Sequence, residues 1–189
     1  MVLEGSEHEL IESCRRGERE GFRALFETYK AKVYSVALRF AGDEATAMDI
    51  AQDTFVKLFS SIRDFRGDAA FETWVYRLVV NCCLDHQRRQ RRLLPLAAEI
   101  LASLRASSDA LAEMLRNELR GRVRSAVDRL PPALRLVIVL RYTEGLSYEQ
   151  IADVLGCSSG TVASRLNRAH KMLERRLAHL ARTQGGSRD

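Results

Sequence analysis

The chain has 189 residues, of which 46% are hydrophobic and 29% are charged, and its formal net charge is +5. This composition is typical of a folded, soluble protein, and the length allows one domain or two small ones. No apolar run approaches the roughly 20 residues of a membrane span, and the N-terminus MVLEGSEHEL lacks the basic and then apolar order of a secretion signal. We therefore expect a cytoplasmic protein without membrane insertion.

Residues 9–92 show the apolar spacing of helices. Hydrophobic side chains recur at i, i+3, i+4 and i+7 over 22–29, and a similar pattern follows over 33–40. Asp43 can cap the next helix, and a last helix is predicted over 71–92. No segment alternates with the period of two that a half-buried strand shows, so this part is predicted to be a helical bundle.

Residues 93–117 differ in composition from the rest. They contain Pro95, no aromatic residue and the turn-forming sequence Ser107-Ser108-Asp109. We predict a flexible linker here. We also expect the domains on either side to have independent cores and to move relative to each other.

Residues 118–182 again show helical spacing, interrupted by turn signals. Pro132 can occupy the first turn of a helix. Ser147 and Gln150 have the spacing of a capping box at the start of the next one. Gly156 favours the left-handed turn that ends that short helix.

The segment after Gly156 predicts a helix with two unlike faces. Ser158 or Ser159 can cap it, and at about 100° per residue the apolar residues between Val162 and Leu173 fall on one side. Two helices joined by a tight turn, the second carrying hydrogen-bond donors on its outer side, are typical of a helix-turn-helix. The second helix of that motif enters the DNA major groove. The simpler alternative is a solvated amphipathic helix at the end of a bundle. The predicted DNA-contacting residues are Ser159, Gly160, Thr161, Ser164, Arg165, Asn167, Arg168 and Lys171.

Three segments together resemble one protein family. LSYEQIADVLGCSSGTVASRLNRAHKML resembles the promoter-contacting segment of the extracytoplasmic-function (ECF) sigma factors of bacterial RNA polymerase, and DIAQDTFVKLF and FRGDAAFETWVYRLVVNCCLDHQRRQRR resemble earlier segments of the same family. The similarity extends from about Phe22 to Leu177. It implies an all-α chain of two small helical domains, with sigma region 2 over 9–92, the flexible linker over 93–117 and sigma region 4 with the helix-turn-helix over 118–182.

The resemblance also implies a function. ECF sigma factors bind core RNA polymerase, direct it to specific promoters and help to open the DNA, and an anti-sigma factor masks their binding faces. In this family the helix-turn-helix contacts the upstream (−35) promoter element. Many members carry a basic residue where this chain has Ala163, which removes one DNA contact on that side of the helix.

An acidic segment implies a contact with the polymerase. Asp49 and Asp53 are four residues apart and therefore share one helix face. From the residues alone this is equally a solvated face with acids placed favourably near a helix start. The resemblance implies that the segment binds a coiled coil of the largest polymerase subunit. The residues predicted to bind core polymerase are Asp49, Gln52, Asp53 and Phe55.

The segment FRGDAAFETW and the basic helix after it imply a contact with the −10 promoter element. The resemblance implies that the loop over 65–71 receives a base flipped out of the opened DNA. Binding energy can offset the few kcal/mol that unstacking typically costs. Taken singly, each of the two phenylalanines is also a candidate core residue. The predicted contacts are Phe65, Arg66, Gly67, Asp68, Ala69, Phe71, Arg77, Asn81, Asp85 and Arg88.

No enzyme activity, cofactor or metal is expected. The sequence has no glycine-rich phosphate loop followed by lysine and no nucleophile elbow. Cys82 and His86 are four residues apart and could share one ion, but no second pair of ligands lies nearby, so the cysteines are expected to be reduced core residues. Two other functions remain open: a helix-turn-helix regulator that acts without polymerase core, and an adaptor protein with a basic face.

Overall fold

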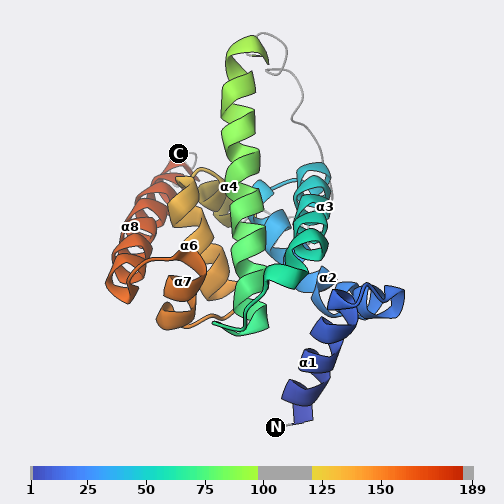
Figure 1. The fold of residues 1–189 in the computed structure, drawn as a ribbon. Helices are drawn as coiled ribbons and strands as arrows, with labels where there is room; N and C mark the ends of the chain where they lie inside the picture. Colours follow the sequence, from blue (N-terminus) through green and yellow to red (C-terminus); the bar gives the residue numbers. More distant parts are fainter. Residues whose placement is uncertain (1, 98–120, 185–189) are drawn as a thin grey trace, which may run out of the picture.

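The structure is a computed structural model that describes residues 2–97 and 121–184. Within these ranges the chain forms helices and no strand, as the spacing of apolar residues predicts (Figure 1). The elements are α1 (Val2–Arg15), α2 (Arg19–Ala41), α3 (Glu44–Ser61), the short 3-10 helix η1 (Ile62–Asp64), α4 (Phe71–Ala97), α6 (Pro132–Tyr142), α7 (Tyr148–Leu155) and α8 (Ser159–Gln184). Residues 121–128 are also helical.

Helices α1 to α4 form the N-terminal domain. Helix α2 ends at Gly42, and the side chain of Asp43 then caps α3 by accepting a 2.8 Å hydrogen bond from the backbone N–H of Thr46, as predicted. Helices α2, α3 and α4 pack against one another. Helix α1, which starts before the predicted boundary at residue 9, packs closely on α2 at Gly21, where an added Cβ would lie 2.4 Å from the Ser13 hydroxyl oxygen.

Helix α4 is longer than predicted. It begins at Phe71, as expected, but continues beyond Arg92 and through Pro95 to Ala97, so that it extends past the other helices in Figure 1. The predicted linker therefore begins later than residue 93. Its remaining part, 98–117, lies outside the described residues.

Helices α6, α7 and α8 form the C-terminal domain, and local sequence signals set their ends. Pro132 opens α6. The capping box at α7 is present, because the Ser147 side chain accepts from the Gln150 N–H and the Gln150 side chain accepts from the Ser147 N–H. Gly156 closes α7 with a φ of +60°, a conformation that disfavours residues with a Cβ.

The two domains share one continuous core, which differs from the expected pair of independent cores. Buried residues of α2, α3 and α4 belong to the same cluster as buried residues of α6, α7 and α8. Helix α4 packs against α7, and α2 packs against α6. In Figure 1 the C-terminal helices accordingly lie against the side of α4.

Candidate nucleic-acid and polymerase interfaces

Helix α8 has the predicted two faces. Val162, Leu166 and Ala169 are fully buried against α6 and α7. Asn167 and Arg168 lie exposed on the outer side. Lys171 is also exposed on this side. The helix-turn-helix therefore presents an amide and two cations to solvent, which are donors suited to base edges and phosphates.

The first turn of α8 leaves room for a phosphate. Ser158 caps the helix, because its hydroxyl oxygen lies 3.2 Å from the N–H of Thr161 and accepts its hydrogen bond. At Gly160 a Cβ would meet nothing nearer than the Ser158 hydroxyl at 3.9 Å, so the backbone here is open. Ser159, by contrast, is half-buried.

Two of the α8 residues predicted to contact DNA also interact with other groups of the protein. The Ser164 hydroxyl donates a 2.9 Å hydrogen bond to the carbonyl oxygen of Thr161, one turn earlier. Arg165 is half-buried, and one guanidinium nitrogen lies 4.0 Å from the Cys157 sulfur in the turn between α7 and α8. Arg165 therefore lies on the flank of the helix, and Asn167 and Arg168 form its more exposed part.

The loop before α4 is exposed at its tip and buried at its ends. Arg66, Gly67 and Asp68 are exposed, and Ala69 is half-buried. Phe71, in contrast, has only 2% of its surface exposed, because it packs against Tyr29, Phe65 and Trp74. The expectation that Phe71 contacts DNA therefore does not fit its position, since the whole ring is in the core.

Phe65 takes an intermediate position in the same cluster. It is half-buried, edge-on to Phe71 at 5.0 Å between ring centroids and 5.4 Å from Trp74. A guanidinium N–H of Arg15 donates to the Phe65 carbonyl oxygen and fastens the loop to α1. The exposed loop tip is thus held on a rigid aromatic base.

The polar residues of α4 differ in their partners. Asn81 is exposed. The Asp85 carboxylate accepts from Lys57 on α3 at 3.1 Å and from Arg88 at 3.0 Å. The hydrogen bond from Lys57, followed by the positive charges of Lys57 and Arg88, lowers the pKa of Asp85 below its ordinary value. Arg77 is half-buried and does not face solvent freely, because it contacts the C-terminal domain.

The acidic residues of α3 lie beside basic residues of α4. Asp49 and Gln52 are exposed, and Asp53 forms a 3.3 Å ion pair with Arg89. These residues line a shallow polar hollow of about 320 Å³ between the two helices. The predicted shared face of Asp49 and Asp53 is therefore present, with a cation at its edge.

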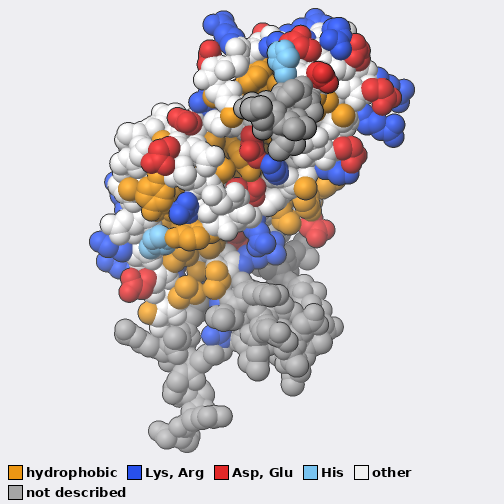
Figure 2. All heavy atoms as spheres, turned by 90° about the horizontal axis from the view of Figure 1, so that it is seen from below, with side chains coloured by type: hydrophobic (Ala, Val, Ile, Leu, Met, Phe, Trp, Pro, Cys, Tyr) orange, Lys and Arg blue, Asp and Glu red, His pale blue; other side chains and the backbone are white. Residues whose placement is uncertain are grey.

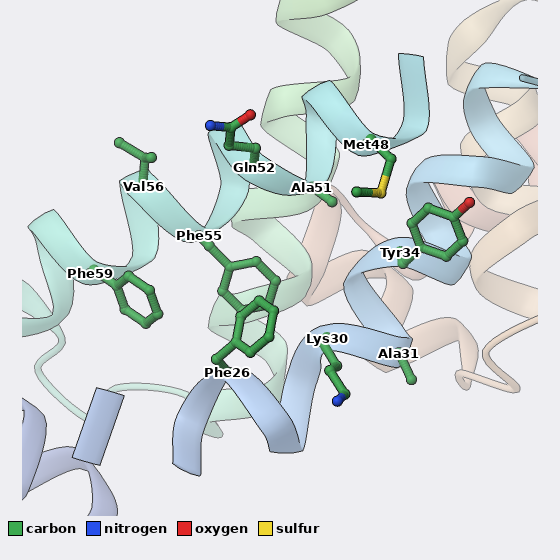
Figure 3. A pocket seen from close by; sticks show the side chains of 10 residues that line it. All are labelled: Phe26, Lys30, Ala31, Tyr34, Met48, Ala51, Gln52, Phe55, Val56 and Phe59. Carbon is green, nitrogen blue, oxygen red and sulfur yellow. The ribbon is translucent and has the colours of Figure 1, made fainter. Parts of the chain in front are cut away.

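An apolar groove lies on the other side of Gln52 from the polar hollow. It has a volume of about 660 Å³ and runs between α2 and α3 (Figure 3). Phe55 packs at its base, with its ring 4.8 Å from that of Phe26, while Met48 and Val56 are each 61% exposed. The residues that line the groove are Phe26, Lys30, Ala31, Tyr34, Met48, Ala51, Gln52, Phe55, Val56 and Phe59.

Most groove residues were not identified from the sequence. The apolar spacing over 22–29 includes Phe26 among the core positions, whereas Phe26 is 40% exposed. A usable signal was present in Met48 and Val56, which are apolar but lie outside the inward-facing positions of α3. An apolar residue off the buried stripe of an amphipathic helix indicates a second contact surface.

The surface charge is mixed. On the face seen in Figure 2, Lys and Arg side chains alternate with Asp and Glu side chains, and hydrophobic side chains reach the surface between them. This face is therefore not uniformly basic. Within the described residues, no helix is long and apolar enough to cross a membrane.

The cysteines of α4 are part of the core. Cys82 and Cys83 are buried, as expected, and burial raises the pKa of the Cys83 thiol. In residues 2–97 and 121–184, no three His, Cys, Asp or Glu side chains are grouped so that they could hold a metal ion.

Comparison with known proteins identifies the family. The family model of sigma-70 region 2 matches residues 25–93, and that of sigma-70 region 4 matches residues 120–173. The RNA polymerase sigma-H factor of Pseudomonas aeruginosa is 35% identical over 191 residues, which cover 96% of this chain and 99% of the relative. The ECF RNA polymerase sigma-E factor of Escherichia coli K12 is 36% identical over 184 residues, covering 92% and 95%. The chain belongs to the ECF sigma factors.

This sigma factor also resembles solved structures. CnrH, solved in complex with the cytosolic domain of CnrY, has 27% sequence identity and a TM-score of 0.66, with 90% of this chain and 96% of that chain covered. The sigma factor RpoE of Bartonella quintana, solved with the anti-sigma factor NepR, has the same fold, with 22% identity, a TM-score of 0.64 and coverage of 83% and 96%. The predicted all-α fold of two helical regions is confirmed.

Membership of the family establishes the general function. The chain is an alternative sigma factor, a regulatory subunit that directs RNA polymerase to promoters. A helix-turn-helix regulator that acts without polymerase core is not favoured, because the match includes sigma region 2 as well as the helix-turn-helix.

Proposed function

We propose that this sigma factor divides promoter recognition between its two regions, with α8 contacting the −35 element, the α4 loop contacting the opened −10 element and α3 binding core polymerase. The observation that carries the proposal is the exposed row of Asn167, Arg168 and Lys171 opposite the buried face of α8. We further propose that the protein acts in the cytoplasm, where the polymerase and the chromosome are.

At the −35 element, α8 makes two kinds of contact. Asn167 and Arg168 lie within the first three turns, which is the part of a recognition helix that approaches base edges. Amide and guanidinium groups can each form two hydrogen bonds with adenine and guanine, respectively. Gly160 at the helix start approaches the phosphate backbone, because N–H groups at a helix N-terminus without an intrahelical partner bind phosphate.

At the −10 element, the loop tip holds one strand of opened DNA. Arg66, Gly67 and Asp68 are exposed above the base formed by Phe65 and Phe71. Phe65 is the aromatic residue that remains accessible to a flipped base, and Phe71 fixes its position from below. Along α4, the exposed side chains of Asn81 and Arg88 continue the path for the strand.

Core polymerase binds α3 over two adjoining hollows. Gln52 lines both the polar hollow beside Asp49 and Asp53 and the apolar groove at Phe55. An acidic edge beside an apolar groove complements a helical partner that carries basic and apolar residues in turn. We assign the groove and the acidic edge to the same partner, the coiled coil of the largest polymerase subunit.

An anti-sigma factor is the second protein partner that we propose. CnrH, which shares the fold and 27% of its residues with this chain, is bound in its solved structure to the cytosolic domain of CnrY. The groove with Met48 and Val56 exposed is an apolar surface that a regulator could cover and thereby compete with polymerase.

The test is binding of the purified chain to core polymerase without DNA. We expect a stable complex with the wild type and a weaker one with Asp53→Arg, which reverses the charge of the acidic edge. Its matched control is Glu174→Arg on α8, an exposed acid outside the proposed surface. If the wild type binds promoter duplex but not core polymerase, the chain acts as a helix-turn-helix regulator and the proposal is wrong.

A further inference from the structure

Helix α1 contributes no residue to the proposed DNA and polymerase interfaces. The family model of sigma-70 region 2 matches residues 25–93, and α1 ends before them at Arg15. Its inner face is nevertheless part of the N-terminal core, because Ile11 is 6% exposed and Cys14 is 1% exposed. Helix α1 packs on α2 and also contacts η1, the 3-10 helix that leads into the loop before α4. A firmly packed helix therefore lies beside the base of that loop.

Arg15 is the residue of α1 that bonds to the loop. One terminal guanidinium nitrogen donates a hydrogen bond to the carbonyl oxygen of Phe65, which lies 50 positions later in the chain. The other terminal nitrogen lies 2.5 Å from a carboxylate oxygen of Glu12, one turn earlier on α1. The Arg15 side chain is 31% exposed, and its Nε atom is buried. Because much of this cation is removed from water, the loss of an acceptor costs more here than at an exposed arginine.

Phe65 connects the packed base of the loop to its exposed tip. Its ring lies edge-on to Phe71, with 5.0 Å between the centroids, and 5.4 Å from Trp74. Beyond it, residues 66–68 are exposed. At Gly67 the φ is +80°, and an added Cβ would meet no other atom within 4 Å. The position of the tip therefore depends on how firmly the base at Phe65 is held.

The contacts of Arg15 favour a role in holding the loop over a direct contact with DNA. Both of its terminal nitrogens already have acceptors inside the protein. The next residue, Arg16, is 59% exposed and pairs at 2.5 Å with Glu18 in the turn between α1 and α2. The two arginines thus carry the same charge at neighbouring positions, but Arg15 bonds to the loop and Arg16 bonds to its own turn.

We propose that Arg15 is a positioning residue for −10 recognition: by holding the Phe65 carbonyl group, it keeps the aromatic base and the tip of the loop in the arrangement that receives the flipped base. The inference rests on the proposed −10 contact of this loop. Without the bond the loop spends part of its time in other arrangements, and the apparent affinity for the base falls by the fraction that remains in place. A hydrogen bond from a charged group changes such an equilibrium by about ten-fold or more.

The first test measures how firmly the loop base is held in the free chain. The Phe65 N–H donates a 3.3 Å hydrogen bond to the Ile62 carbonyl oxygen, so its hydrogen exchange reports the opening of the base. Arg15→Met, which leaves an unbranched side chain without donors, should raise this exchange rate about ten-fold. The Ala47 N–H, which donates to the Asp43 carbonyl oxygen at 3.1 Å, should keep its rate, because it lies at the start of α3.

The matched control is Arg16→Met, which removes the same charge from the next position. It should leave the exchange of both amides unchanged. The inference is refuted if the Phe65 amide of Arg15→Met exchanges at the wild-type rate. It is also refuted if the Ala47 amide accelerates equally, since Arg15 would then stabilise the whole domain and not the loop.

The second test measures base discrimination by the chain combined with core polymerase. The probe is the non-template single strand of the −10 element of a promoter that the complex transcribes, intact or with one base replaced at a time. With Arg15→Met we expect the preference for the intact strand at its most selective position to fall about ten-fold, while Arg16→Met keeps the wild-type preference. A lost phosphate contact would instead weaken all strands alike and lower the salt slope by about 0.7. That result with Arg15→Met would overturn the inference.

A loop-tip variant distinguishes failure of this inference from failure of the proposed function. Arg66→Ala and Asp68→Ala are combined in one chain, since both side chains are exposed at the tip. If this chain loses base discrimination and Arg15→Met retains it, Arg15 is not a positioning residue and the proposed −10 contact stands. If both retain it, the loop does not select bases, and the proposed −10 contact and the role of Arg15 fail together.

Discussion

The Nε atom of Arg77 on α4 lies 2.9 Å from the carbonyl oxygen of Asp153 on α7. The two residues are 76 positions apart in the chain, and they belong to the two regions that we propose to contact the −10 and −35 promoter elements. A side chain suited to a phosphate is thus occupied by a backbone acceptor of the other region. In this arrangement the Nε–H group of Arg77 is therefore not available for the predicted DNA contact.

Base contacts and phosphate contacts on α8 should respond differently to mutation. Arg168→Ala should reduce discrimination at one position of the −35 element by about 1–3 kcal/mol. Arg175 lies about two turns further along and is also exposed. Arg175→Ala should weaken binding to all sequences alike and lower the slope of log affinity against log salt by about one. Binding to promoter duplexes with single substitutions, across a salt series, measures both effects.

The assignment of Arg168 fails if Arg168→Ala keeps full discrimination and changes only the salt slope. If neither variant differs from the wild type, α8 is a solvated helix that does not enter the groove. Thermal unfolding of both variants serves as the control, because both side chains are exposed and should contribute little to stability.

The apolar groove should be required for polymerase binding. Val56 is 61% exposed on α3, so Val56→Asp should leave the fold intact while placing a charge where an apolar partner docks. We expect at least about a ten-fold loss of affinity for core polymerase. Ala45→Asp is the control, since it adds the same charge to an exposed position of the same helix outside the groove. Equal affinity of the two variants would exclude the groove as a docking site.

Phe71 should contribute to stability. Its ring is 2% exposed and contacts Tyr29, Phe65 and Trp74, so Phe71→Ala should leave a cavity and lower the free energy of unfolding by about 3–5 kcal/mol. Phe26→Ala, at a 40% exposed phenylalanine, should lower it by much less. Denaturant unfolding of the two variants makes the comparison. Similar losses for both would show that Phe71 is not a core residue.

The Asp85 ion pairs should make a small, pH-dependent contribution to stability. The hydrogen bond from Lys57 and the charge of Arg88 lower the pKa of Asp85 below its ordinary value of 3.8. The stabilisation is therefore fully present above about pH 4 and is lost as the pH falls through the lowered pKa. Because the Asp85 side chain is 37% exposed, solvent screening limits the contribution to less than about 1 kcal/mol.

Asp85→Asn should therefore reduce the free energy of unfolding at pH 7 but not at pH 2. Urea unfolding at both values tests this, with Lys57→Met as a second variant that removes the partner instead. A difference between wild type and Asp85→Asn that is the same at both pH values would contradict the proposed origin of the pKa shift.

Features set by neighbouring residues were predictable from the sequence. The caps at Asp43 and Ser147, the turn at Gly156 and the alternation of faces on α8 all depend on residues within one or two helical turns. The predicted DNA-facing part of α8 follows from the same local pattern. The caps, the turn and the two faces of α8 agree with the structure, and the DNA contacts of α8 stay a prediction.

Features set by tertiary packing were not predictable in the same way. Phe65 and Phe71 lie six residues apart and look alike in sequence, yet only Phe71 is enclosed, because Tyr29 of α2 packs against its ring. The groove forms only where Phe26 meets Phe55 across two helices. The carboxylate of Glu144 accepts hydrogen bonds from Ser35 and Tyr76, which lie 109 and 68 residues earlier in the chain, and no helical period encodes such a pairing.

Promoter opening with and without core polymerase tests the central claim most directly. Permanganate reactivity of thymines in a duplex promoter, together with run-off transcription from it, is measured for the chain alone, core polymerase alone and both. The account predicts reactive thymines at the −10 element and a defined transcript only when both are present. Two results would contradict it. One is reactive thymines with core polymerase alone, and the other is the absence of both opening and a transcript when the chain and core polymerase are combined.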